Sequence, residues 1–307
     1  QCRATAQPPA TQTSGRALSL RHVPGQFRRM SLEDFRLLRD IVYEHAGLVY
    51  DESAMMLFDR RLSERLEALG LPNYQAYYKY LRFDAHNQQE LEEAVERLTT
   101  KETYFFRQEY QLRAFQSELL PRLEQANARS RRLVVWSAGC STGEEAYTLA
   151  ALILESERFD SWDVRVIGTD LSKQSVVHAR RGVYQASSLR ATSARDKVRY
   201  FFEMNDGFHV EDSVKKLCQF GQMNLFDVGR GNLVGRVDAI FCRNVLIYFD
   251  VRSRKRVIDN LYQRISPGGY LMLGHSESLL NLSTAFELVH LRDDLVYRKP
   301  LGAPGGT

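Results

Sequence analysis

The chain has 307 residues, of which 44% are hydrophobic and 26% are charged, a composition typical of globular domains and long enough for two of them. No apolar run approaches the roughly 18 residues of a membrane-spanning helix. The net charge of +4 comes from interspersed acids and bases, so we expect neither membrane insertion nor a nucleic-acid-binding surface. Four widely spaced cysteines form no zinc-like cluster, so no metal is expected, and reduced thiols favour a cytoplasmic location.

The two ends of the chain lack the patterning of folded sequence. Residues 1–30 mix proline, glutamine, threonine, serine and arginine without hydrophobic periodicity, and they lack the apolar core of a secretory signal. We expect disordered tails over residues 1–30 and 301–307.

Residues 31–100 show only helical patterning. Ser31 can cap a first helix, in which apolar residues recur at helical spacing until Gly47. A second helix is expected over about 54–69, ended by Gly70, and two more over YQAYYKYL and QELEEAVERLTT. The region therefore predicts a small all-α domain.

Three arginines of the second predicted helix could form a basic docking face. They are Arg60, Arg61 and Arg65. Acidic residues on the same helix balance their charge, so an ordinary solvated surface is the alternative.

The remainder alternates between strand and helix patterns. After a linker and junction helix over 101–131, apolar runs such as LVVW, DVRVIG and VDAIFC alternate with helical segments as far as residue 300. This order is typical of an α/β domain with a parallel sheet, and the ending FELVHLRDDLVYRK predicts an antiparallel hairpin. The stretch at about 200–222 breaks the alternation, and its turn signal predicts a small antiparallel β insert.

The loop in WSAGCSTGEE, residues 136–145, is the first strand-to-helix turn, where open parallel sheets bind ligands. A phosphate-binding loop needs lysine and serine or threonine after its last glycine, but Glu144 and Glu145 stand there. A dinucleotide site needs GxGxxG, whereas this loop has only Gly139 and Gly143, so NAD is disfavoured.

A nucleoside ligand that is positively charged and lacks phosphate fits the two acids better. S-adenosylmethionine (SAM) carries a sulfonium and an ammonium group. Asp170, at the end of the second strand, stands where an acid accepts hydrogen bonds from ribose hydroxyls; the alternative is a helix-capping role.

Polar residues at the ends of two further strands should reach the same edge. Arg243 and Asn244 end the strand VDAIFC, and Tyr248 follows. Asn224, which closes the insert, should approach the same edge, where its amide could read an adenine.

Five motifs, in order, resemble those of the chemotaxis receptor methyltransferases, the CheR family, over residues 31–300. They are TTKETYFFR, WSAGCSTGEEAY, TDLS, FCRNVLIYFD and PGGYLMLGHSES. The resemblance implies a Rossmann-like class I SAM-dependent methyltransferase domain after the all-α domain. It also implies methyl transfer from SAM to glutamate side chains of chemoreceptors, giving glutamyl 5-O-methyl esters and S-adenosylhomocysteine.

The resemblance also implies roles for particular residues. Arg107 and Tyr248 would act at the reaction centre, with Arg107 also touching the cofactor. The other implied cofactor contacts are Thr103, Gly139, Glu145, Asp170, Asn224, Leu225, Arg243 and Asn244. The family pattern usually has asparagine where Lys101 stands, and a lysine cannot accept a hydrogen bond.

The implied partner is the cytoplasmic helical bundle of a chemoreceptor, which the basic second helix would face. Because the predicted insert loop is short, we expect no binding of a peptide tether at the receptor C-terminus, and we expect a monomer. The alternatives are a regulator that senses SAM without turnover and a methyltransferase of another substrate.

Overall fold

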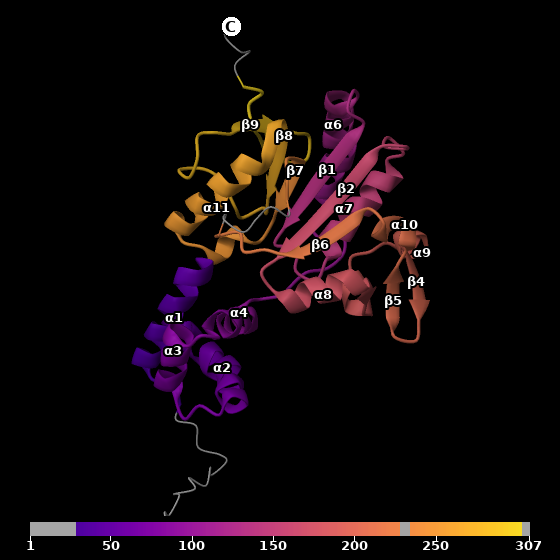
Figure 1. Cartoon of the computed structure of the whole chain (residues 1–307). Helices are drawn as coiled ribbons and strands as arrows, with labels where there is room; N and C mark the ends of the chain where they lie inside the picture. The colour runs from indigo at the N-terminus through magenta and orange to yellow at the C-terminus, as the bar shows by residue number, and fades with distance from the viewer. Residues whose placement is uncertain (1–28, 228–233, 303–307) are drawn as a thin grey trace, which may run out of the picture.

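The computed structural model describes residues 29–227 and 234–302, so most of the two expected tails lies outside the described residues. Figure 1 shows a group of helices below a larger α/β domain. The predicted N-terminal tail is one residue too long, because Met30 is buried and its N–H donates to Asp59.

The helical part contains the predicted elements: α1 (Leu32–Ala46), α2 (Met55–Leu69), α3 (Tyr74–Phe83) and α4 (Asn87–Leu98). Ser31 caps α1 in a capping box with Asp34, and Gly47 ends it in the left-handed region at φ 71°. These caps satisfy backbone groups that a helix leaves unpaired at its ends.

Arg65 is part of the interior of the helical domain. Its guanidinium donates two hydrogen bonds to the buried carboxylate of Glu90, at 2.9 and 2.5 Å. The Tyr77 hydroxyl donates to the same carboxylate at 2.7 Å, and burial, followed by this bond, raises the pKa of Tyr77. The prediction of Arg65 as a docking residue is therefore wrong, because its charge is used to neutralise Glu90.

The α/β domain is built on a seven-stranded sheet in the order β6-β2-β1-β7-β8-β10-β9. The first five strands of this order run parallel, and the last two form an antiparallel hairpin. The strands are β1 (Arg132–Ala138), β2 (Asp163–Asp170), β6 (Cys218–Gln222), β7 (Val237–Cys242), β8 (Ile265–Leu273), β9 (Glu287–His290) and β10 (Leu295–Arg298).

Helices cover both faces of this sheet, as the alternating pattern predicts. Alternate residues of β1 and β7 pack into two separate hydrophobic clusters. One cluster contains α11 (Val251–Arg264), and the other contains α5 (Glu109–Ala114), α6 (Leu120–Asn127) and α7 (Glu144–Glu155). The strand order reverses between β1 and β7, so the point where ligands bind in such sheets lies at the loops that follow them.

The insert has different bounds from those predicted. A three-stranded antiparallel sheet, β3-β5-β4, unites β3 (Val183–Tyr184), β4 (Phe201–Met204) and β5 (Gly207–Val210). The sheet thus begins before residue 200. Residues 218–222 form β6 of the main sheet, because they pair in parallel with β2. The helix α11 ends at Arg264, and the segment ISPGG that follows it is the first part of β8.

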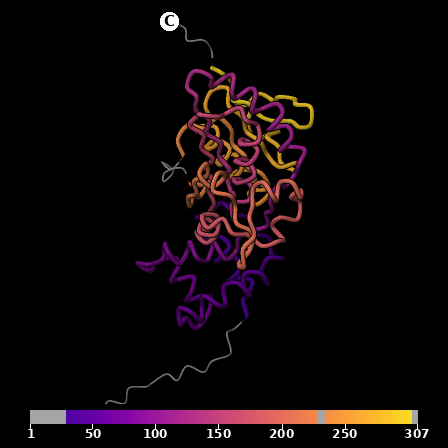
Figure 2. Tube along the Cα trace, turned by 90° about the vertical axis from the view of Figure 1, so that its right-hand side faces the viewer, coloured from indigo at the N-terminus to yellow at the C-terminus, as the bar shows by residue number. Residues whose placement is uncertain are grey.

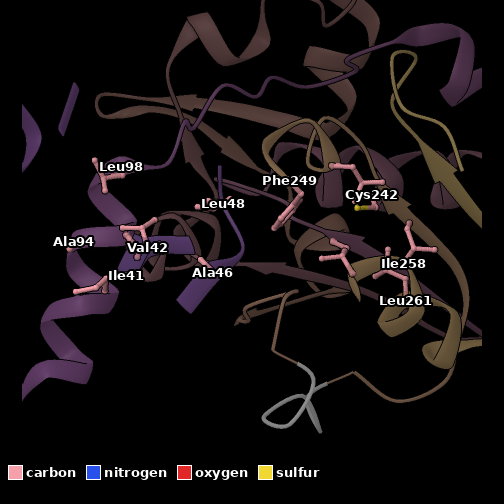
Figure 3. Close-up of a cluster of buried hydrophobic side chains, with 14 of the residues drawn as sticks. Ile41, Val42, Ala46, Leu48, Ala94, Leu98, Cys242, Phe249, Ile258 and Leu261 are labelled. Carbon is pink, nitrogen blue, oxygen red and sulfur yellow. The ribbon is translucent and has the colours of Figure 1, made fainter. Parts of the chain in front are cut away.

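The two domains share one hydrophobic core. Figure 3 shows Val42, Ala46 and Leu48 of the helical domain near Phe249 of the α/β domain. The same cluster continues to α11 (Figure 3). Figure 2, turned by 90°, confirms that the helices lie at one end of the α/β domain.

Polar contacts also join the domains. Glu96 of α4 accepts hydrogen bonds from the Ser172 hydroxyl and from the N–H groups of Lys173 and Gln174. It therefore places a carboxylate at the N-terminus of α8 (Lys173–Arg181), where the free N–H groups and the helix dipole favour negative charge. Tyr43 of α1 likewise donates to Asp250, the cap of α11, at 3.0 Å.

We predict that Arg65→Ala lowers the free energy of unfolding by about 3 kcal/mol, because it leaves Glu90 buried without a cation. Arg60→Ala is the matched control: Arg60 is exposed on the same helix, and we expect a change within about 0.5 kcal/mol. Chemical denaturation of the two variants checks this. Equal stability of both variants would contradict the structural role of Arg65.

Candidate functional site

A cavity of about 260 Å³ lies at the carboxyl ends of β1, β2 and β7, beside the helical domain. It is lined by the end of α1, by the segment at 99–107 and by loops of the α/β domain. All ten residues predicted for the cofactor and the reaction centre line it: Thr103, Arg107, Gly139, Glu145, Asp170, Asn224, Leu225, Arg243, Asn244 and Tyr248. Segments that lie far apart in the sequence thus form one site, although the role of each residue stays a prediction.

The glycine loop uses its own N–H groups internally. The N–H groups of Gly139 and Cys140 both donate to the carbonyl of Thr169, at 2.8 and 2.9 Å, and that of Gly143 donates to the carbonyl of Cys140. The Ser141 N–H donates to Asp170. A phosphate would find these donors already paired, which is a second reason against a phosphate ligand.

Gly139 is required by two features of this loop. Its φ is 80°, in the left-handed region that favours glycine. A Cβ at this position would also come within 2.5 Å of Cγ2 of Val245. The absence of a side chain therefore lets the loops after β1 and β7 meet at the cavity.

The two glutamates after this loop point in different directions. Glu144 is buried outside the cavity, where it accepts hydrogen bonds from Thr142 and Ser188, and desolvation raises its pKa. Only Glu145 lines the cavity. The interpretation that both acids attract a cationic ligand is therefore wrong for Glu144, because the start of α7 turns successive side chains apart.

Glu145 forms a buried ion pair with Arg243. Oε2 of Glu145 lies 2.7 Å from Nε of Arg243, and Oε1 accepts a hydrogen bond from the Ser137 hydroxyl. Nη1 of Arg243 donates to the carbonyl of Arg107 at 3.0 Å and to the side chain of Gln111 at 3.2 Å. Arg243 therefore orients Glu145 and fixes the segment at 107–111 against the end of β7.

Asp170 lies at the end of β2, as predicted. One oxygen accepts the Ser141 N–H at 2.8 Å and the other accepts the Ser172 N–H at 2.9 Å. Burial raises the pKa of this carboxyl, opposed by the two backbone hydrogen bonds and by Lys101. Asp170 thus lines the cavity, as the ribose interpretation requires, and it also accepts the Ser172 N–H before α8, as the alternative interpretation requires.

Asn224 lines the cavity, but its amide already has protein partners. Nδ2 donates to the carbonyl of His45 at 2.7 Å, and Oδ1 accepts the Phe226 N–H at 3.0 Å. The side chain joins the end of α1 to the loop after β6. The Asn224 amide is therefore used within the protein, where it holds Leu225 and the neighbouring backbone at the cavity.

Arg107 lines the cavity, and it forms no ion pair with a carboxylate in the part of the chain that the structure describes. It donates to the carbonyl of Glu102 at 3.1 Å and lies 5.7 Å from the centre of the Tyr104 ring. Arg190 stacks on this ring at 3.8 Å. The arrangement positions a cation that is available to an anionic ligand.

Lys101, where the family pattern has asparagine, also lines the cavity. Its ammonium lies 3.5 Å from Oε1 of Glu96, the carboxylate at the start of α8. The lysine thus forms a domain-joining ion pair beside Asp170.

Of the other two predicted docking arginines, Arg60 is exposed and forms no ion pair among the described residues. Arg61 is also exposed, and it donates to the carbonyl of Arg97. Neither lines the cavity at the sheet edge.

Two residues that line or support the cavity were missed by reasoning from the sequence. The hydroxyl of Ser141 is buried at the cavity and has no hydrogen-bond partner among the described residues. Its position between the two loop glycines was the available signal. The other is Glu277, within the motif GHSES.

Glu277 holds the loop that follows β7. Its carboxylate accepts five backbone N–H groups, four consecutive ones in that loop and one in its own, at 2.7 to 3.3 Å; the donors belong to Asn244, Val245, Leu246, Ile247 and Gly274. Asn244 has a φ of 60°, which is uncommon for a non-glycine residue. The carboxylate stabilises this loop, which carries six residues of the cavity wall.

The cavity is suited to SAM on the observations of this structure. The loop donors are paired, which disfavours an anionic group, while carboxylates of Glu145 and Asp170 lie at the wall. The unpaired hydroxyl of Ser141 offers a further polar contact. Within the described ranges no cluster of potential metal ligands occurs, and no helix is long and apolar enough to cross a membrane.

Both parts of the chain match models of known domain families. Residues 33–99 match the all-alpha domain of the CheR methyltransferases, and residues 101–294 match their SAM binding domain. Chemotaxis protein methyltransferase 2 of Vibrio cholerae is 34% identical over 270 residues, covering 87% of this chain and 93% of that protein.

Two further proteins show the range of similarity. The chemotaxis protein methyltransferase of Borreliella burgdorferi is 32% identical over 249 residues, covering 80% of this chain and 87% of that protein. A solved structure, that of magnesium protoporphyrin IX methyltransferase from Synechocystis with bound SAM, is 17% identical, with a TM-score of 0.32. The match covers 60% of this chain and 77% of that one. The two domain matches and the relatives show that the chain belongs to the CheR methyltransferase family.

Proposed function

We propose that this protein transfers the methyl group of SAM to glutamate side chains of a chemoreceptor, forming glutamyl 5-O-methyl esters and S-adenosylhomocysteine in the cytoplasm. Membership of a SAM-dependent methyltransferase family and similarity to chemotaxis protein methyltransferases support this function. The observation that carries it is the meeting of all ten predicted residues at one cavity.

The cofactor, when bound, supplies an electrophilic methyl group. We assign Asp170 to the ribose hydroxyls, because its carboxylate ends β2 at the cavity wall. Glu145 would meet the ammonium of the methionine part, with Arg243 setting its orientation from behind. Leu225 and the neighbouring backbone would contact the adenine.

The acceptor needs orientation rather than activation. A glutamate is ionised at pH 7, so methyl transfer by in-line displacement requires no strong general base. Arg107 offers a cation without a carboxylate partner among the described residues, which suits an acceptor carboxylate. Tyr248, which lines the cavity from the loop after β7, would orient the same carboxylate from its other side.

The helical domain is the proposed docking surface for the receptor. Arg60 and Arg61 are exposed on α2, so they, without Arg65, remain candidates for contact with an acidic helical bundle. The paired residues Met204 and Gly207 show that the turn between β4 and β5 is short, which supports action without a C-terminal tether.

The test of the proposed function uses SAM with a labelled methyl group and purified cytoplasmic fragments of chemoreceptors. We expect label on the fragment that mild base releases as methanol, because carboxylate methyl esters hydrolyse readily. Label that is stable to base would indicate another acceptor. Binding of SAM with no transfer to any fragment would indicate a sensor of the cofactor.

We predict that Arg107→Ala reduces kcat at least a hundredfold while the Kd for SAM changes less than about fivefold, because the cation acts on the acceptor. Arg113→Ala is the control, since Arg113 is exposed and pairs with Glu109 away from the cavity. Turnover by Arg107→Ala at the wild-type rate would contradict the role of Arg107.

We predict that the affinity for SAM falls as the pH is lowered towards the raised pKa of Asp170. The sign follows because the ionised carboxylate is the better acceptor for ribose hydroxyls, so ligand binding competes with protonation. Asp170→Asn should bind weakly at every pH and lose this dependence in calorimetric titrations. Identical pH profiles for the two proteins would rule out the assignment.

We predict that peptides matching chemoreceptor C-termini bind too weakly to detect at micromolar concentration. The short β4–β5 turn leaves little loop to enclose a peptide beside the insert. Calorimetry of the full chain with such peptides checks this, and micromolar affinity would contradict it.

A further inference from the structure

Four exposed apolar side chains belong to two segments, 46–50 and 243–251, that contribute residues to the cavity wall. Their exposed fractions are 46% for Val49, 45% for Ile247, 37% for Tyr248 and 67% for Val251. Ile247 and Tyr248 line the cavity itself, while Val49 and Val251 lie outside its wall. We call these four residues the apolar rim.

The rim is assembled from both domains. The N–H of Val49, just after α1, donates to the carbonyl of Tyr248 at 2.9 Å. Leu48 pairs with Phe249 in an isolated antiparallel bridge, and Val251 begins α11 directly after this point. The helical domain thus contributes one side of the mouth and the α/β domain the other.

The backbone beneath the rim is held firmly. Glu277 accepts the N–H groups of residues 244–247, including Ile247 at 3.3 Å. A side chain held in a fixed place on the surface loses little entropy when a partner covers it. Apolar groups that are clustered, exposed and preorganised beside a cavity are typical of a binding surface.

The charges beside the rim favour an acidic partner. Asp250 uses its carboxylate to cap α11 and to accept the Tyr43 hydroxyl, and Glu52 pairs with Arg36. Arg252, next to Val251, is exposed and forms no ion pair within the described residues. Arg107, which lines the cavity, likewise forms no ion pair within the described residues, so an acidic segment at the mouth would meet two arginines without a carboxylate partner.

From these observations we propose that the apolar rim binds the segment of the receptor that carries the acceptor glutamate, by covering apolar side chains close to that glutamate. This inference rests on the proposed function and adds to it a determinant of which glutamates are accepted. The acceptor carboxylate enters the cavity towards Arg107, while its apolar neighbours pack on Val49 and Val251.

The test replaces only the two rim residues outside the cavity wall, in the variant V49S/V251S. We expect KM for a receptor fragment that the wild-type enzyme methylates to rise about tenfold, because the variant loses an apolar contact with it. The kcat at saturating fragment and the Kd for SAM should stay unchanged. L288S is the matched control, since Leu288 is 51% exposed on β9 at the far edge of the sheet.

A receptor variant completes the test. Serine in place of the apolar residue nearest the acceptor should raise KM with the wild-type enzyme but add little with V49S/V251S, because both changes remove the same contact. A KM for V49S/V251S within twofold of wild type would overturn the inference. A change in the oligomeric state of V49S/V251S in sedimentation would also overturn it, by showing that a second copy covers the rim.

The two levels of the proposal can fail separately. If the wild-type enzyme methylates no receptor fragment, the proposed function falls, and the rim inference falls with it. If a fragment is methylated but KM is the same for V49S/V251S and for the wild type, only the rim inference falls.

Discussion

The buried ion pair between Glu145 and Arg243 is the contact on which the geometry of the cavity depends. It joins the first turn of α7 to the end of β7, and through Nη1 of Arg243 it reaches the backbone of Arg107. Burying two charges is costly unless further hydrogen bonds satisfy them. Ser137 and Gln111 supply such bonds, so the pair fixes three wall segments relative to one another.

Three further carboxylates also hold segments of the site in place. Asp170 holds the glycine loop through the Ser141 N–H, Glu277 holds the loop after β7, and Glu96 holds the start of α8 against the helical domain. Each acid pairs with backbone N–H groups of a segment distant in sequence. The N–H groups of the glycine loop are consequently used within the protein, and recognition of a ligand passes to side chains such as those of Asp170 and Ser141.

Local signals in the sequence were sufficient for much of the fold, whereas most of the predicted site residues came from the resemblance to the CheR family. Ser31 and Gly47 define α1 through their own capping chemistry, and the strand–helix alternation gives the sheet and its ligand-binding edge. Partners distant in sequence could not be predicted. Arg65 looks like a surface cation until Glu90, from another helix, is placed beside it, and the orientations of Glu144 and the Asn224 amide depend in the same way on tertiary contacts.

The most direct measurement of the central claim is calorimetric titration of the full chain with SAM, with ATP as the comparison. The cavity described above predicts saturable binding of SAM that Arg243→Ala weakens, because Glu145 loses its orienting partner, and no detectable binding of ATP, because the loop donors are already paired. Tight binding of ATP, or SAM affinity that does not change in Arg243→Ala, would contradict this account.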